Sequence, residues 1–264
     1  MTYEPFVPPA GSAPGGPMPA APRLPDGAGA PGEPAHPALV TMPYQGYQPY
    51  GAPPLRGTGG LGSAAIVLAC VWTALQAVGA LLAPAAAQAL RDADEAGRSA
   101  FDSEFTAYDG VSTLTGVVQV AAYVVTCLWM YRSRSTAVAA NPTFIHARGP
   151  VWSWLGWWVP VVSLWFPYQV VRDVRRATAP GPVSGIGGWW AAWLVFLMGS
   201  NMVGRLTIGS SPGSAGNAAD VLVGLEALTT VAMIAALVFW IRVVRDVTRY
   251  QGERIAAARQ ERMA

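Results

Sequence analysis

Two charged side chains interrupt the apolar stretches of the sequence, and they are the residues whose position could support chemistry. Arg205 lies near the end of one apolar run, and Glu226 lies near the start of the next. In an antiparallel pair of helices, the two side chains would lie at similar depths in the membrane. A lone charge there costs about 2.5 kcal/mol or more, so we expect an intramembrane ion pair between them. Such a pair could act as a gate or an ion relay, or it could be purely structural, with both side chains reaching toward the interface.

Other residue types argue against several classes of enzyme. The two histidines, His36 and His146, both lie outside the apolar runs, which disfavours a zinc site or a serine–histidine hydrolase within the membrane. The glycine-rich stretch 209–216 lacks the lysine of a phosphate-binding loop. Cys70 and Cys127 lie in separate apolar runs and form no CxxC motif. We therefore expect a non-enzymatic protein with no catalytic residue, no metal and no cofactor.

Long apolar runs must position these side chains. The chain has 264 residues, of which 52% are hydrophobic and 12% charged, whereas soluble domains carry about 25% charged residues. Five runs contain no charged residue apart from Glu226, and they span residues 57–90, 110–131, 149–171, 177–204 and 221–241. About 20 apolar residues cross the hydrocarbon core as a helix, in which every backbone group is satisfied internally. The sequence therefore predicts an all-α, multi-pass membrane protein.

The arginines indicate how many runs cross. All 17 basic residues are arginine, and they concentrate on the cytoplasmic side of most membrane proteins. Three groups follow the second, third and fifth runs: Arg132, Arg134 and Arg148; Arg172, Arg175 and Arg176; and Arg242, Arg245, Arg249, Arg254, Arg259 and Arg262. All three groups and both termini lie inside only if the third run enters the membrane without crossing. We therefore predict four transmembrane helices plus a Trp/Pro-rich re-entrant or interfacial segment, with five transmembrane helices as the alternative.

The composition of the third run favours the same topology. It contains five of the 11 tryptophans, which prefer the membrane interface. Pro160 and Pro167 each remove a helical hydrogen bond, and their spacing would bend a helix twice in one direction. In addition, residues 170–176 resemble residues 243–249, and both segments follow an apolar run. We expect both segments to leave the membrane on one side.

A set of aromatic, proline, glutamine and arginine residues in the middle of the chain forms a motif. Its members are Trp129, Arg132, Trp157, Pro160, Trp165, Pro167, Tyr168, Gln169 and Arg172. This motif resembles domain-of-unknown-function family 4328, which consists of bacterial multi-pass membrane proteins common in high-GC Gram-positives. The resemblance covers about residues 60–250 and implies a helical membrane fold without implying an activity. One difference is Thr136, because the family often has asparagine there.

The remaining segments suggest partners. Residues 1–59 hold 15 of the 23 prolines and are expected to form a disordered cytoplasmic tail that could bind a protein partner. Residues 60–250 should form the membrane domain, and residues 251–264 a basic cytoplasmic extension. We expect a scaffold or interaction protein of the cytoplasmic membrane, in contact with the bilayer and with anionic lipid headgroups, and with no nucleic-acid partner. The alternative is a small transporter or channel subunit.

Overall fold

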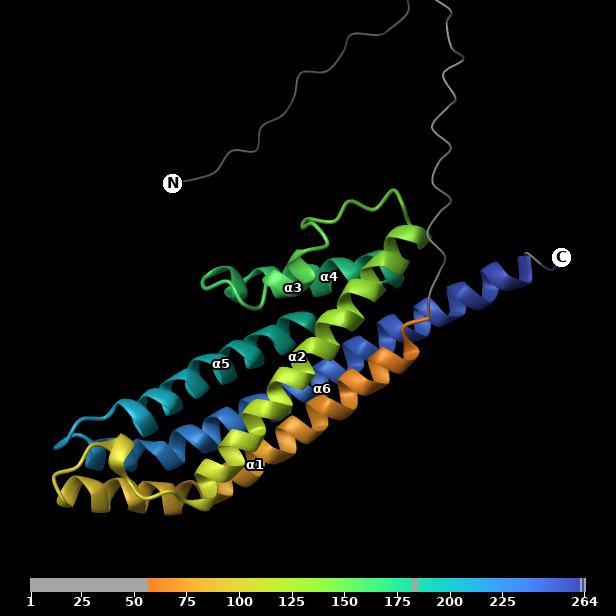
Figure 1. Cartoon of the computed structure of the whole chain (residues 1–264). Helices are drawn as coiled ribbons and strands as arrows, with labels where there is room; N and C mark the ends of the chain where they lie inside the picture. Colours follow the sequence, from red (N-terminus) through yellow and green to blue (C-terminus); the bar gives the residue numbers. More distant parts are fainter. Residues whose placement is uncertain (1–56, 182–184, 262, 264) are drawn as a thin grey trace, which may run out of the picture. The chain divides into compact units, whose positions relative to one another are not determined.

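A computed structural model describes residues 57–181, 185–261 and 263. The structure is built from helices, and no strand occurs in these residues. Four helices are long: α1 (Gly59–Glu95), α2 (Ala107–Ala140), α5 (Ile186–Gly209) and α6 (Ala215–Glu261). Between α2 and α5 lie the short helices α3 (Trp152–Leu155) and α4 (Phe166–Thr178), and two 3₁₀ turns occupy Ala100–Asp102 and Val162–Leu164 (Figure 1).

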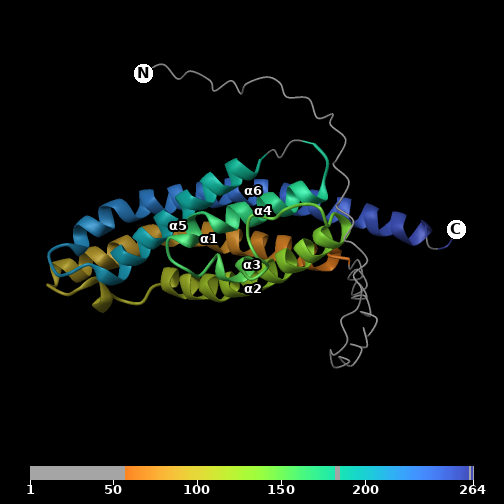
Figure 2. The same ribbon diagram turned by 90° about the horizontal axis from the view of Figure 1, so that it is seen from above.

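The four long helices are each long and apolar enough to cross a membrane. They lie side by side in the order α2, α1, α6, α5, because α1 packs against α2 and α6, and α6 packs against α5 (Figure 2). Direct packing between α2 and α5 is slight in the described chain. The predicted all-α membrane fold with four spanning helices is confirmed.

The third apolar run is not a continuous helix. It forms α3, a turn, a 3₁₀ turn and the start of α4, so the five-helix alternative has no fifth spanning helix in the described residues. Pro160 lies in the turn, and Val161 after it has a φ of 66°, a strained value for a β-branched residue. Pro167 lies in the first turn of α4, where a missing N–H costs nothing. Pro167 therefore begins α4, and the run, which the structure describes in full, contains no straight helix that the two prolines would have to bend.

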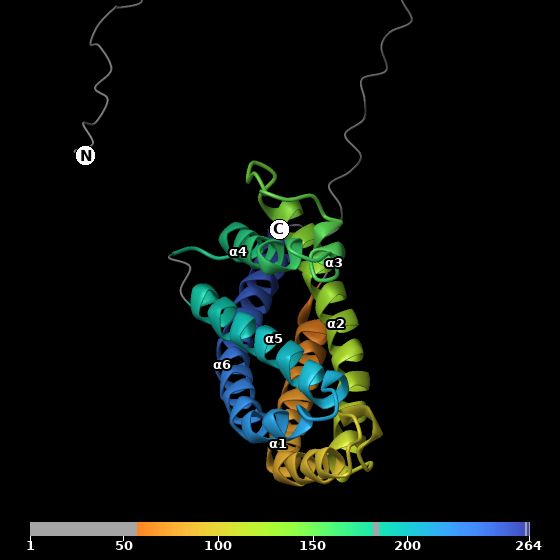
Figure 3. The same cartoon turned by 90° about the vertical axis from the view of Figure 1, so that its left-hand side faces the viewer.

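One end of the bundle gathers the arginines. The short helices α3 and α4 lie at this end, next to α2 (Figure 3). The two similar segments meet there, since Arg175 of α4 pairs with Asp246 of α6 at 3.4 Å. The two similar segments therefore lie at the same end of the bundle.

The opposite end of the bundle carries the acidic loop between α1 and α2. Asp94 accepts a hydrogen bond from the Gly213 backbone at 2.7 Å, and Arg91 pairs with Asp220 at 3.0 Å. These contacts join the end of α1 to the start of α6. The molecule therefore has one basic end and one predominantly acidic end.

A glycine in α5 allows close approach to α6. A Cβ atom added at Gly199 would overlap the methyl group of Thr229, which is fully buried. We predict that Gly199→Ala lowers the free energy of unfolding by about 1–2 kcal/mol, because overpacking outweighs the better helix propensity of alanine. Gly204→Ala on the same helix is the matched control, since nothing lies within 4 Å of its added Cβ. Thermal unfolding in detergent should show the loss for the first variant only, and equal stability of both variants would contradict the prediction.

The predicted domain boundaries meet the described residues only in part. The tail expected over residues 1–59, with its possible protein partner, lies almost entirely outside them. Helix α1 already begins at Gly59. At the other end, α6 continues without a break from residue 250 to Glu261, so residues 251–261 of the expected basic extension are the last turns of this helix.

Candidate functional site: a polar cleft between α2 and α5

A cleft of about 840 Å³ separates α2 from α5 in the acidic half of the bundle. Its walls are the first turns of α2 and the last turns of α5, and its base is formed by the middle of α1 and the first third of α6. Many of its lining side chains are polar: Gln76, Tyr108, Asp109, Ser112, Thr113, Thr115, Gln119, Ser200, Asn201, Arg205, Thr207, Glu226 and Thr229. Such a polar lining is unusual between spanning helices, and it is typical of a cavity that holds water or a polar solute.

Glu226 lies at the base of this cleft and is 4% exposed. It is about 16 Å along α6 from the first residue of the helix, at 1.5 Å per residue. Its carboxylate accepts a hydrogen bond from the hydroxyl of Tyr108 at 2.5 Å and one from the amide of Gln76 at 2.8 Å. The hydroxyl of Thr229 lies 3.5 Å from the same carboxylate. All of these partners are neutral, so they satisfy the oxygens without balancing the charge.

The expected ion pair between Arg205 and Glu226 is not formed. Both residues line the cleft, but no salt bridge joins them in the part of the chain that the structure describes. Arg205 is an exposed residue on α5, where its guanidinium can stay hydrated. Glu226 is instead bonded to Gln76 of α1, whose amide donates to its carboxylate. The physical reason is that the two carboxylate oxygens of Glu226 already accept hydrogen bonds, one from Tyr108 of α2 and one from Gln76 of α1.

The cleft was missed by the sequence analysis, although the sequence contains a signal for it. Ser112, Thr115 and Gln119 recur at intervals of three and four residues, so they share one face of α2. Ser200 and Thr207 share a face of α5 in the same way. Two polar stripes on different spanning helices indicate a shared polar cavity, because lipid would not solvate either of them.

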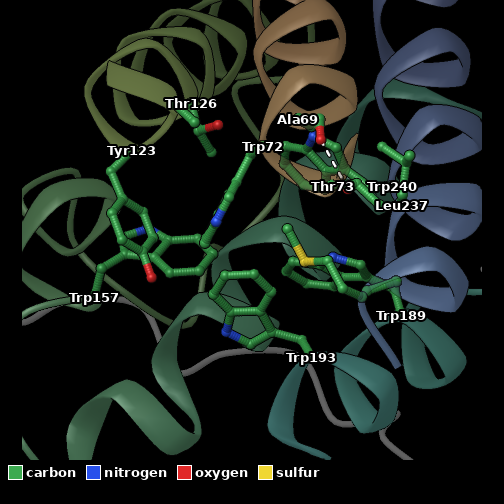
Figure 4. Close-up of a pocket in the computed structure, with 13 residues that line it drawn as sticks. Ala69, Trp72, Thr73, Tyr123, Thr126, Trp157, Trp189, Trp193, Leu237 and Trp240 are labelled. Atoms are coloured by element: carbon green, nitrogen blue, oxygen red, sulfur yellow. Dashed lines mark hydrogen bonds between the residues drawn. The ribbon is translucent and has the colours of Figure 1, made fainter. Parts of the chain in front are cut away.

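A second, smaller pocket of about 50 Å³ lies behind the cleft, toward the basic end. Aromatic side chains from all four long helices and from the α3–α4 segment surround it (Figure 4): Trp72, Tyr123, Trp157, Trp189, Trp193 and Trp240. Trp72 lines both the pocket and the cleft, and it packs edge-on against Trp193 at 5.7 Å between ring centroids. The aromatic cluster therefore closes the inner end of the polar cleft.

The aromatic residues of the family-like motif belong to this aromatic cluster or lie beside it. Trp129 is 1% exposed and packs edge-on against Trp240 of α6. Trp157 packs against Trp193 of α5, with 6.0 Å between the ring centroids. This contact holds the α3–α4 segment against the aromatic pocket. Trp165 is half exposed and contacts Tyr168. None of these residues reaches the polar cleft, which indicates that they hold the fold.

The polar residues of the motif fix α4 and the loop before it. Gln169 accepts a hydrogen bond from the Arg148 side chain at 2.7 Å. The guanidinium of Arg172 lies over the ring of Tyr168, 5.5 Å from its centroid. Arg132, in contrast, is exposed on α2. The motif residues therefore lie near the basic end of the bundle, away from Glu226.

The same loop contains the histidine that the sequence placed outside the apolar runs. The backbone N–H of Ala147 donates to the carboxylate of Asp173 at 2.7 Å, which ties the loop to α4. Burial and the nearby charge of Arg134 lower the pKa of His146, so this histidine is uncharged at neutral pH. It contributes no positive charge to the basic end.

Comparison with known proteins identifies a family for this chain. The profile of a family described as Domain of unknown function (DUF4328) matches residues 91–249, which include the end of α1, all of α2 to α5 and most of α6. No curated protein and no solved structure matches the chain. Because the matched region covers more than half of the sequence, the chain belongs to domain-of-unknown-function family 4328.

Proposed function

We propose that this protein is a small membrane transporter whose cleft receives an organic cation, with Glu226 as the group that meets the positive charge. The observation that carries the proposal is the buried carboxylate at the base of an 840 Å³ polar cleft, with only neutral hydrogen-bond partners. An ionisable side chain within a membrane is costly and is generally retained for function. A scaffold needs neither the cleft nor the carboxylate.

The charge balance of the cleft favours a positively charged solute. Glu226 and Asp109 contribute two carboxylates to the lining, and Arg205 contributes one guanidinium. The carboxylate of Asp109 is occupied in capping α2, where it accepts from Thr106 at 2.7 Å. Glu226 is the carboxylate at the base of the cleft, where a bound cation would replace or share its neutral hydrogen-bond partners. Arg205 is exposed to water that screens its charge.

The size and lining of the cleft favour an organic cation over a metal ion. A volume of 840 Å³ lies within the range of about 300–1,000 Å³ that is common for small-molecule sites. Trp72, Tyr108 and Phe196 also line the cleft, and aromatic rings attract quaternary ammonium groups. No cluster of three metal-ligating side chains occurs among the described residues.

Transport across the membrane would also require a passage through the aromatic layer. Trp72 separates the polar cleft from the aromatic pocket, and Trp157 of the α3–α4 segment covers that pocket from the basic end. Movement of these two side chains would connect the cleft with the opposite side. The α3–α4 segment would then act as the inner gate, and the cleft as the outer vestibule.

The charges at the two ends suggest the orientation in the cytoplasmic membrane. Arginines concentrate on the cytoplasmic side of membrane proteins. We infer that the end carrying α4 and the last turns of α6 is cytoplasmic, together with both termini. The cleft, whose walls lie at the acidic end of α2 and α5, would then open toward the outside.

Uptake of tetraethylammonium tests the proposal. This permanent cation crosses lipid slowly and carries no proton, so its entry into proteoliposomes reports on the protein alone. We expect saturable uptake several times faster than that into protein-free liposomes. Equal rates in the two preparations would contradict transport, and binding without uptake would reduce the function to cation binding.

A further inference from the structure

A third cavity, of about 710 Å³, lies at the basic end, in a groove between the start of α1 and the arginine-bearing part of α6. It is separate from the polar cleft, which lies in the acidic half of the bundle. Arg242, Arg245 and Arg249 line one side of the groove. Residues at spacings of three and four share one face of a helix, so all three guanidinium groups are presented together.

The charge of this groove is only partly balanced. Asp246 is the carboxylate among its lining residues, and it already pairs with Arg249 at 3.7 Å and with Arg175 at 3.4 Å. Arg242 and Arg245 are exposed, and neither forms an ion pair with an acid in the described chain. Three guanidinium groups against one carboxylate leave the groove positively charged by two units.

The start of α1 adds hydrogen-bond donors at the same place. Thr58 precedes α1, but its hydroxyl donates to Gln251 and leaves the first turn without a side-chain cap. Gly59 lines the groove and is exposed, so it leaves the uncapped first turn of α1 open on this side, whereas Gly62 is buried against Thr248 and Val244 of α6. The hydroxyl of Thr248, also in the lining, is buried without a hydrogen-bond partner. A helix start beside free arginines favours the binding of a phosphate group.

Apolar side chains continue the groove toward the middle of the membrane. Ile66 and Val67 line it one to two turns further along α1, and Val67 is 59% exposed. Arg242 directly follows the last apolar residue of the run in α6. The groove is therefore basic at the membrane boundary and apolar below it, in the order in which a phospholipid presents its phosphate and its acyl chains.

We propose that this groove binds an anionic phospholipid, with the phosphate on Arg242 and Arg245 and an acyl chain along Ile66 and Val67. A free phosphate would use only the basic half of the groove, which is why the continuous groove favours the lipid. The lipid bridges α1 and α6 at the basic end. This site does not depend on the function proposed for the cleft.

The test compares lipids and variants on the delipidated, full-length protein in detergent. Phosphatidylglycerol is titrated while the midpoint of thermal unfolding is followed, with phosphatidylcholine and inorganic phosphate as separate ligands. We expect phosphatidylglycerol to raise the midpoint and phosphatidylcholine to raise it less. The double variant Arg242→Gln/Arg245→Gln should bind phosphatidylglycerol roughly 30-fold more weakly, since each arginine near an anionic surface adds about a factor of five.

The matched control is Arg254→Gln/Arg259→Gln, which removes two exposed arginines from the same helix beyond the groove. It should respond to phosphatidylglycerol as the wild type does. Equal weakening by both double variants would show a general charge effect and overturn the proposal. An equal response to phosphatidylcholine would overturn the role of the arginines, and an equal response to inorganic phosphate would show a soluble-anion site instead.

Discussion

Replacing Glu226 by glutamine should weaken the binding of tetraethylammonium at least about tenfold, which corresponds to about 1.4 kcal/mol. The change removes the negative charge but keeps the shape of the side chain. Glutamine can still accept from Tyr108, and the amide of Gln76 can turn to present its oxygen, so the helices remain joined. The loss would therefore report the charge itself and not a collapse of the cleft. Binding is measured by equilibrium dialysis of the protein in lipid nanodiscs.

Two control variants separate this effect from general electrostatics. Asp220→Asn removes an exposed carboxylate from the same helix, outside the cleft lining, and should leave the affinity unchanged. Arg205→Gln removes a positive charge from the cleft and should strengthen binding by about two- to fivefold, since surface charge pairs contribute up to about 1 kcal/mol. A Glu226→Gln protein that is folded and binds within twofold of the wild type would exclude Glu226 as the cation-binding group.

Replacing Gln251 by leucine should cause the largest loss of stability among single substitutions at the basic end. Gln251 is 2% exposed, and its side chain connects three other segments. It accepts from the hydroxyl of Thr58 at 2.8 Å, and it donates to the carbonyl of Ser133 at 2.8 Å and toward the hydroxyl of Thr178 at 3.4 Å. Leucine fits the volume but leaves these polar groups buried without partners, at about 1–3 kcal/mol each.

We expect this substitution to lower the free energy of unfolding by about 3 kcal/mol and the unfolding midpoint in detergent by about 5 °C or more. Gln260→Leu is the control, because Gln260 is an exposed residue of the same helix. It should leave the midpoint nearly unchanged. If the two variants had the same unfolding midpoint, Gln251 would not be the residue that joins α2, α4 and the start of α1 to α6.

The spanning helices and their topology followed from the sequence because membranes impose strong, local constraints. Runs of about 20 apolar residues without charge have few alternatives to a helix. The arginine groups placed the third run at the basic end, where Arg175 and Asp246 now join α4 to α6. The prolines also indicated that this run is not one straight helix, since Pro160 lies in a turn and Pro167 begins α4.

The site was harder to infer, because lipid-facing and core-facing surfaces are both apolar. The sequence therefore gives little information on how each helix is rotated about its axis. Glu226 stands out in the sequence because it is the one charged residue within the apolar runs. Its hydrogen-bond partners, however, are distant in the sequence: Tyr108 is 118 residues away and Gln76 is 150 residues away. Two polar stripes carried information on rotation: Ser112, Thr115 and Gln119 indicate the wall of the cleft on α2, and Ser200 and Thr207 indicate its wall on α5.

Accessibility of Ser200 is the most direct test of a water-filled, cation-binding cleft. Ser200 lines the cleft on α5, and a cysteine there can be labelled in a protein whose own Cys70 and Cys127 have been replaced by alanine. Val195 on the same helix is outside the cleft lining and provides the lipid-facing control. In nanodiscs, we predict that a hydrophilic thiol reagent labels Ser200→Cys quickly, that tetraethylammonium slows this labelling, and that Val195→Cys reacts little. Slow labelling at position 200, or labelling that tetraethylammonium leaves unchanged, would contradict a cation site in the cleft.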